Sequence, residues 1–244
     1  MDVRIFDTKE AMGQVAATDG AKSIAEALAD RGRANVIIAT GASQFEMLAA
    51  LVAAEVDWSR VTFFHLDEYV GLPITHPASF RKYLKERFVD RLPTPPAAFH
   101  YVNGEGDCEA ECDRLGELIA GCTIDVAFVG IGENGHLAFN DPPADFEATE
   151  PYLVVDLDDA CRRQQFGEGW FESFEAVPRR AITMSIPQIL KTRKIICTVP
   201  DQRKAAAAER AIEGPVTPDV PASAMQRHGN TTLYLDKAAA SRLK

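Results

Sequence analysis

Residues 130–142, GIGENGHLAFNDP, combine closely spaced glycines with side chains that can transfer protons. The glycines Gly130, Gly132 and Gly135 match the pattern GxGxxG, and the polar side chains are those of Asn134, His136 and Asp141. Such glycines can wrap the pyrophosphate of a dinucleotide at the start of a helix. They can equally bring a histidine, which titrates near neutral pH, close to a small substrate. The two interpretations predict different proteins.

The residues after the third glycine decide between these interpretations. A dinucleotide site needs a helix that begins within the glycines and an acidic residue about 20 positions later. Asp156 stands at that distance, but Pro142 and Pro143 follow the glycines too closely for a long helix. We therefore interpret this stretch as an active-site loop at the end of a strand rather than as a nucleotide fingerprint.

Within this loop, His136 is the chain's best candidate for a general acid/base. Asp141 is expected to orient it or to balance its charge, and Gly135 to allow a ligand to approach closely.

A pair of carboxylates, Asp67 and Glu68, directly follows the apolar run of residues 61–66. A carboxylate shielded from water at a strand end has a raised pKa and can act as a general base. A helix cap or a solvated pair is an alternative. Together with His65 the pair could also bind a metal, but strand alternation sends Glu68 away from the other two and no second cluster joins them. We predict no metal.

A short run of small residues, Thr40, Gly41, Ala42 and Ser43, lies between a predicted strand and a predicted helix. Backbone N–H groups at such a helix start can bind an anion, although an ordinary turn capped by Ser43 is the alternative. Lys204 stands in the first turn of another predicted helix, the unfavourable end for a cation. A bound anion beside Lys204 would offset this unfavourable interaction. The alternative is that Lys204 is a solvated surface lysine.

The elements that position these residues alternate between strand and helix patterns. Apolar runs predict strands at residues 36–40, 61–66, 124–130, 153–156, 181–184, 194–199 and 232–235. Helical spacing predicts helices at residues 19–31, 43–55, 79–90, 107–120 and 201–213, with Ser79, Asp107 and Asp201 as N-caps. This order predicts a doubly wound, mostly parallel α/β sheet with helices on both faces, in one domain over residues 1–244. Ligands of such sheets bind beyond the carboxyl ends of the strands.

Composition narrows the class of protein. The 244 residues carry a net charge of −10, which disfavours nucleic acid or an anionic membrane as a partner but allows a small anionic ligand in a local pocket. The five cysteines form no CxxC pair, and the N-terminus has no apolar signal core. We expect a cytoplasmic protein with reduced thiols, and the residues leave a homo-oligomer open.

Taken in order, TGAS, FFHLDEYVGLPITHPASF, GIGENGHLAFNDP, VPDQRKA and VPAS resemble the glucosamine-6-phosphate deaminase/isomerase family over nearly the whole chain. The resemblance implies conversion of an amino-sugar phosphate and water into fructose 6-phosphate and ammonia, without metal or redox cofactor. Asp67 would be the base that moves a proton between carbon 2 and carbon 1. His136 would open the sugar ring, paired with Asp141. Asn134 falls where members carry aspartate or asparagine.

The same resemblance implies that the Thr40–Ser43 turn and Lys204 hold the phosphate of a sugar-phosphate substrate. Two positions depart from the family. Asp141 replaces a usual glutamate, and Gly167 stands about where a phosphate-binding arginine is common, so that Arg162 or Arg163 would have to substitute.

Other functions stay open at this stage. A 6-phosphogluconolactonase-type lactone hydrolase, a deaminase for another sugar and a non-catalytic sugar-phosphate sensor are the alternatives, with a dinucleotide oxidoreductase last. Residues 161–171 read as a mobile lid hinged at Gly167 and Gly169, or as a surface helix and turn.

Overall fold

A computed structural model describes all residues, 1–244. Its main feature is a seven-stranded sheet with the order β1-β10-β9-β6-β2-β3-β5, in which every neighbouring pair is parallel. The strands are β1 (Asp2–Phe6), β2 (Ala34–Ile38), β3 (Val61–His65), β5 (Ala98–His100), β6 (Val126–Val129), β9 (Lys194–Val199) and β10 (Thr231–Asp236). The predicted parallel sheet is therefore confirmed.

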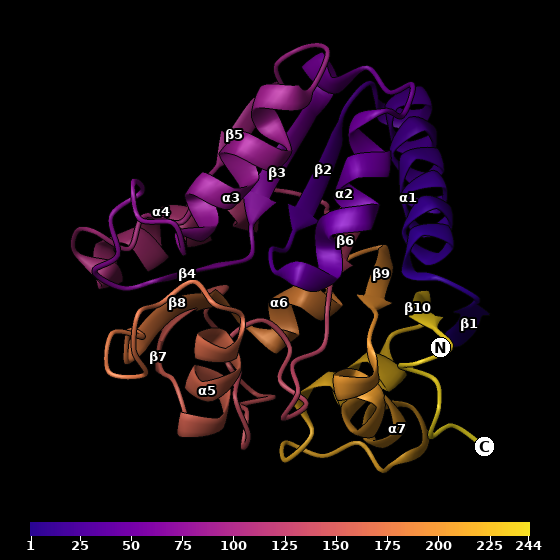
Figure 1. The fold of residues 1–244 in the computed structure, drawn as a ribbon. Helices are drawn as coiled ribbons and strands as arrows, with labels where there is room; N and C mark the ends of the chain where they lie inside the picture. The colour runs from indigo at the N-terminus through magenta and orange to yellow at the C-terminus, as the bar shows by residue number, and fades with distance from the viewer.

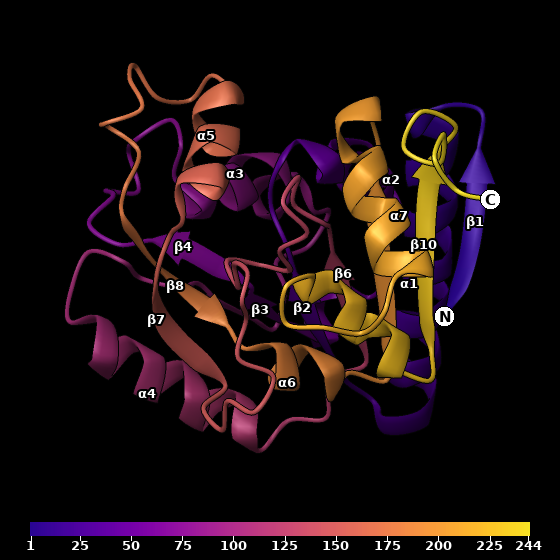
Figure 2. The same ribbon diagram turned by 90° about the horizontal axis from the view of Figure 1, so that it is seen from below.

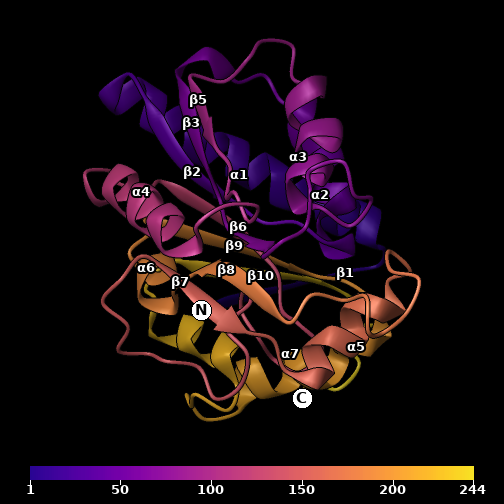
Figure 3. The ribbon, with the colours of Figure 1, turned by 90° about the vertical axis from the view of Figure 1, so that its left-hand side faces the viewer.

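Helices cover both faces of this sheet, as predicted. The helices are α1 (Lys9–Arg31), α2 (Phe45–Val52), α3 (Phe80–Arg87), α4 (Cys108–Ala120), α5 (Asp159–Gly167), α6 (Ile186–Leu190) and α7 (Ala205–Glu213). One apolar core joins α1, α2 and α3 to one face, and a second joins α4, α6 and α7 to the other. Alternate residues of β2, such as Val36 and Ile37, enter opposite cores, as the pleat of a strand requires. Figure 3 shows the two helical layers on either side of the strands.

A second, smaller sheet has the order β4-β8-β7 and is antiparallel. It contains β4 (Asp67–Tyr69), β7 (Tyr152–Asp156) and β8 (Arg180–Met184). The expectation that residues 153–156 and 181–184 belong to the parallel sheet is therefore wrong. Their residues have strand periodicity, but periodicity does not say which strand is the partner. Figure 1 shows this sheet beside α5, below the helices α3 and α4.

The chain passes from the large sheet to the small one at Leu66. Its N–H donates to Ile38 of β2 at 3.2 Å, whereas its carbonyl accepts from Met184 of β8 at 2.9 Å. The next residue, Asp67, begins β4, and it therefore lies at the junction of the two sheets.

The carboxyl ends of the parallel strands meet at one edge of the molecule. In Figure 2, β1 and β10 point toward the end at which α5 lies, and both chain termini lie beside these two strands. The short elements β1, β4, β5 and α6 were not predicted, because three to five residues carry too little periodic signal. No helix is long and apolar enough to cross a membrane.

Candidate active site

A cavity opens at the carboxyl ends of the parallel strands and is closed on one side by α5. Of the predicted site residues, Thr40, Gly41, Ala42, Ser43, Asp67, His136 and Lys204 line it. They come from segments that follow β2, β3, β6 and β9. Asn134 and Asp141 do not line it and lie behind His136. The topology thus brings together residues that are more than 160 positions apart in the chain, between Thr40 and Lys204.

Asp67 has the environment of a general base. Its side chain is 6% exposed at the junction of the two sheets, where it lines the cavity. Burial, reinforced by the neighbouring Glu68 carboxylate, raises the pKa of Asp67 to about 8. A carboxyl group with a pKa in this range can exchange a proton with a substrate near neutral pH.

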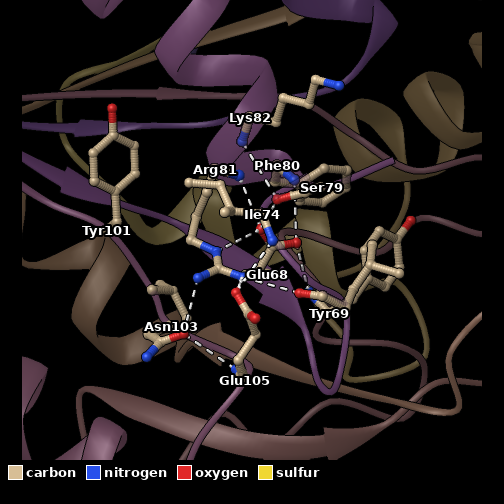
Figure 4. A network of polar contacts seen from close by, with 12 residues as sticks. Glu68, Tyr69, Ile74, Ser79, Phe80, Arg81, Lys82, Tyr101, Asn103 and Glu105 are labelled. Atoms are coloured by element: carbon tan, nitrogen blue, oxygen red, sulfur yellow. Dashed lines mark hydrogen bonds and ion pairs between the residues drawn. The ribbon is translucent and has the colours of Figure 1, made fainter. Parts of the chain in front are cut away.

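Glu68 does not line the cavity and instead lies at the centre of a polar network (Figure 4). Its carboxylate accepts hydrogen bonds from the Ser79 hydroxyl at 2.8 Å and from the backbone N–H groups of Phe80 and Arg81 at 3.1 and 2.9 Å. The Arg81 guanidinium lies 3.3 Å away and is itself buried. Glu68 therefore joins β4 to the start of α3, and this junction fixes the backbone beside Asp67.

The loop after β6 is irregular, as predicted, and no helix begins within its glycines. A Cβ atom on Gly132 would lie 2.2 Å from Nε2 of His136, so this glycine makes room for the imidazole. Gly135 has a φ of +98° and serves the turn, with its N–H bonded to Gly132 at 3.0 Å. Gly135 does not line the cavity, and the close contact within the loop occurs at Gly132, whose neighbour is His136.

His136 is held by a second set of polar groups. Its Nδ1 lies 3.1 Å from Oδ1 of Asp141, and its backbone N–H donates to the side-chain oxygen of Asn134 at 3.0 Å. The Asn134 amide also donates to Asp141 at 3.0 Å, and the Asp158 N–H donates to the same carboxylate. Burial alone would raise the pKa of Asp141, but these donors and His136 lower it overall. A charged Asp141 keeps Nδ1 protonated and leaves Nε2 for the substrate.

Potential metal ligands cluster at one place only. Polar atoms of His136, Asp141 and Cys161 lie within 4.8 Å of one another. However, burial and the neighbouring Asp141 carboxylate raise the pKa of the Cys161 thiol, which favours its neutral form over the thiolate that metals prefer. The set of His65, Asp67 and Glu68 does not converge, since the Nδ1 of buried His65 accepts the N–H of Val102 at 3.3 Å.

The turn after β2 resembles an anion site more than a capped helix. A 3₁₀ turn, Ala42–Gln44, precedes α2, and no side chain caps either element. Gly41 has a φ of +96°, and a Cβ atom on Gly130 would lie 2.9 Å from the Ser43 hydroxyl. The alternative in which Ser43 caps the helix is therefore excluded. Backbone N–H groups at the start of this helix are left for a ligand in the cavity.

Lys204 is buried, with 6% exposure, at the wall of the cavity. Burial lowers its pKa, and the nearby Glu168 and Glu133 carboxylates partly offset that effect. The alternative of a solvated surface lysine is therefore wrong. Asp201 precedes the turn Gln202–Lys204, but its side chain makes no capping hydrogen bond, and its N–H donates to the Asp236 carboxylate.

Sequence reasoning missed other charged residues of the cavity. Asp201, Arg203 and Glu168 also line it. Arg203 and Asp201 adjoin Lys204 in sequence, and this adjacency to a candidate ligand was the available signal. Residues 161–171 begin as the helix α5, whose Gln164 and Gln165 face the cavity, so the helix interpretation of this segment describes its first half.

Comparison with known proteins shows the family. The sequence profile described as glucosamine-6-phosphate isomerases/6-phosphogluconolactonase matches residues 7–234. The chain belongs to this family. The profile spans every strand end of the cavity, from the turn after β2 to Lys204. Membership in the family agrees with the order of motifs that the sequence displays.

Individual relatives cover nearly the whole chain. A glucosamine-6-phosphate deaminase of Lacticaseibacillus paracasei is 38% identical over 245 aligned residues, covering 100% of this chain and 99% of the relative. One of Bacillus cereus is 33% identical and covers 99% and 88% of the two chains. A solved structure of a monomeric glucosamine-6-phosphate deaminase superposes with a TM-score of 0.90 at 32% identity, covering 99% of both chains.

The lactonase branch of the family shares the fold. A 6-phosphogluconolactonase of Shewanella baltica superposes with a TM-score of 0.79, at 21% identity and 97% coverage of both chains. At this identity the likeness establishes the fold alone.

Proposed function

We propose that this protein is a glucosamine-6-phosphate deaminase that converts glucosamine 6-phosphate and water into fructose 6-phosphate and ammonia. The observation that carries the proposal is the arrangement of one cavity: buried Asp67 and His136 lie at one part of it, and an uncapped helix start with buried Lys204 lies at another. A phosphosugar presents both a reacting ring and an anion, and it therefore matches both parts. The relatives with high coverage support the same substrate.

Ring opening is the first step that the geometry supports. His136 is oriented through Nδ1 by Asp141, so its Nε2 can exchange a proton with the ring oxygen and the carbon 1 hydroxyl. Asn134 and Asp141 act as positioning residues in this step, because they hold His136 without lining the cavity.

Proton transfer between carbon 2 and carbon 1 is assigned to Asp67. In the open-chain sugar the base removes the carbon 2 proton and returns it to carbon 1, which converts the aldose amine into a ketose imine. Water then adds to the imine at carbon 2, and ammonia leaves. The raised pKa of Asp67, about 8, suits a group that must both accept and donate this proton.

Binding of the phosphate is assigned to the turn of residues 40–43 and to Lys204. Backbone N–H groups, the Ser43 hydroxyl and a buried ammonium all favour an anion there. Holding the phosphate fixes carbons 1 and 2 near the base, so binding energy from a remote group lowers the barrier to proton transfer. Because residues from Ala39 to Lys204 line this one cavity, we propose that the chain acts as one catalytic unit.

The test is the release of ammonia from glucosamine 6-phosphate by the purified protein, with the galactosamine epimer and a 6-phosphogluconolactone in parallel. We expect ammonia and fructose 6-phosphate from the first substrate at a rate that exceeds the other two. Lactone hydrolysis without ammonia would assign the lactonase reaction instead. Tight binding of glucosamine 6-phosphate without any product would indicate a sensor.

A further inference from the structure

One arginine of the chain lines the cavity, and it is Arg203. It lies in the 3₁₀ turn Gln202–Lys204, directly before the buried Lys204. Arg203 also lines a second cavity, together with Asn134 and Gly167. Its side chain is 40% exposed and lines both cavities.

The two arginines named from the sequence, Arg162 and Arg163, do not line the cavity. Arg162 is buried and donates to the carbonyls of Phe174 and Val177, both at 3.0 Å from Nη2. Arg163 lines the second cavity only, with a side chain that is 69% exposed and 3.8 Å from Asp159. Arg162 is thus held by backbone carbonyls, and Arg163 lies outside the cavity that Arg203 lines.

The balance of charge makes a second cation necessary. Besides Asp67, two carboxylates, Asp201 and Glu168, line the same cavity as Lys204. Lys204 alone would leave the phosphate end with a negative balance, which opposes a phosphate dianion. Arg203 offsets the second of these two carboxylates, and its release from Glu133 leaves its charge available to the ligand. The charge of Arg203 therefore makes the phosphate part of the cavity less negative.

The present partner of Arg203 is weakly held. Its Nη1 lies 3.6 Å from Oε1 of Glu133, and the two side chains are 40% and 36% exposed. An ion pair of this length and exposure contributes little to stability, so it can be exchanged at low cost. Guanidinium binds phosphate oxygens in a bidentate manner, which is stronger than a loose pair with one carboxylate oxygen.

We propose that Arg203 is a phosphate-binding residue that leaves Glu133 and binds the phosphate of the sugar, completing the site made by Lys204 and the turn of residues 40–43. This inference rests on the proposed function, since it assumes a phosphosugar ligand. Because Glu133 belongs to the loop that carries His136, release of Glu133 accompanies occupation of the site.

The experiment is calorimetric titration of fructose 6-phosphate into the full-length wild type and three variants, Arg203→Gln, Arg163→Gln and Glu168→Gln. We expect Arg203→Gln to weaken binding at least tenfold, and the matched control Arg163→Gln to stay within twofold of wild type. Glu168→Gln should bind more tightly, because it removes a negative charge from the cavity. Unphosphorylated fructose should show no difference between the variants.

A change of less than tenfold in Arg203→Gln overturns the proposal, and unchanged affinity in Glu168→Gln contradicts the charge balance. Circular dichroism and the melting temperature establish that each variant is folded. If Arg203→Gln does not fold, Arg203→Lys takes its place, with a smaller but measurable loss expected because a point charge cannot bind two oxygens at once.

Ammonia release by the wild type keeps this inference separate from the proposed function. A wild type that makes ammonia while Arg203→Gln binds normally overturns the Arg203 assignment alone. A wild type that makes no ammonia, while Arg203→Gln loses fructose 6-phosphate, overturns the proposed reaction alone.

Discussion

The two parts of the cavity are built in opposite ways. At the proton-transfer part, the protein supplies its own partners: Asn134, Asp141 and the Asp158 backbone satisfy one another around His136. At the phosphate part, the start of α2 has no side-chain cap and Arg203 has only a loose ion pair.

This difference shows that proton transfer and phosphate binding place different demands on the protein. Groups that must be in place before the reaction are fixed by hydrogen bonds within the protein. Groups that bind the ligand's anion are left without strong internal partners, and the ligand supplies what is missing. Asp67 belongs to the first part, because the hydrogen bonds of the adjacent Glu68 fix its backbone. The carboxylate of Asp67 itself lines the cavity.

The largest effect is expected from Asp67→Asn, which removes the base and leaves the phosphate part intact. We expect turnover of glucosamine 6-phosphate to fall by roughly 10²–10⁴-fold, while binding of fructose 6-phosphate stays within a few-fold. Steady-state kinetics and calorimetry measure the two quantities. Asp156→Asn, at an exposed strand end of the second sheet, is the matched control and should be fully active. Normal turnover in Asp67→Asn would refute the assignment of the base.

The next effect separates two roles within the proton-transfer part. His136→Gln should lower turnover of the ring-closed substrate by about 10²-fold, because ring opening loses its acid/base. An open-chain analogue bypasses that step and should suffer a smaller loss. The ratio of kcat/KM values on the two substrates measures the difference. Equal losses on both would remove ring opening from the role of His136.

A change at the phosphate part should affect binding more than chemistry. Lys204→Gln is expected to raise KM for glucosamine 6-phosphate by roughly 10–100-fold, since a hydrogen bond to a charged group is lost. Turnover of unphosphorylated glucosamine should not change relative to wild type. The exposed Lys191→Gln is the control. An effect of equal size on both sugars would contradict the separation of the two parts.

The smallest effect is in the pH dependence of the wild type. Asp67 acts as a base only when it is deprotonated, and burial together with Glu68 raises its pKa to about 8. Activity should therefore increase as pH rises toward 8. Below pH 7, each decrease of one pH unit should lower kcat/KM by about tenfold. A profile of kcat/KM between pH 6 and 9 measures this limb. A limb centred near pH 4 would show that Asp67 is not shielded from water.

Much of this arrangement was predictable from sequence. The spacing of apolar residues predicted the parallel sheet, and Pro142 and Pro143 correctly excluded a helix after the glycines. Because His136 and the turn of residues 40–43 each follow a predicted strand, the sequence placed them at the same edge of the sheet. The division between Asp67 and Glu68 followed from the family resemblance, because adjacent carboxylates look alike in sequence and differ only in their partners.

Other features depend on contacts between distant residues. The second sheet exists because Leu66 bonds to Ile38 on one side and Met184 on the other, a pairing that no local pattern encodes. Lys204 likewise shares its cavity with residues of α5, and the room for the His136 ring depends on Gly132 rather than on the neighbouring Gly135. Sequence analysis could therefore place these residues at one edge but could not assign their partners.

The central claim, that Asp67 moves the proton between carbon 2 and carbon 1, is tested most directly by isotope exchange. Fructose 6-phosphate and ammonium are incubated with the protein in deuterium oxide, and deuterium at carbon 1 is measured by NMR. We predict incorporation by the wild type and none by Asp67→Asn, although that variant still binds fructose 6-phosphate. Incorporation by Asp67→Asn at the wild-type rate would contradict the claim.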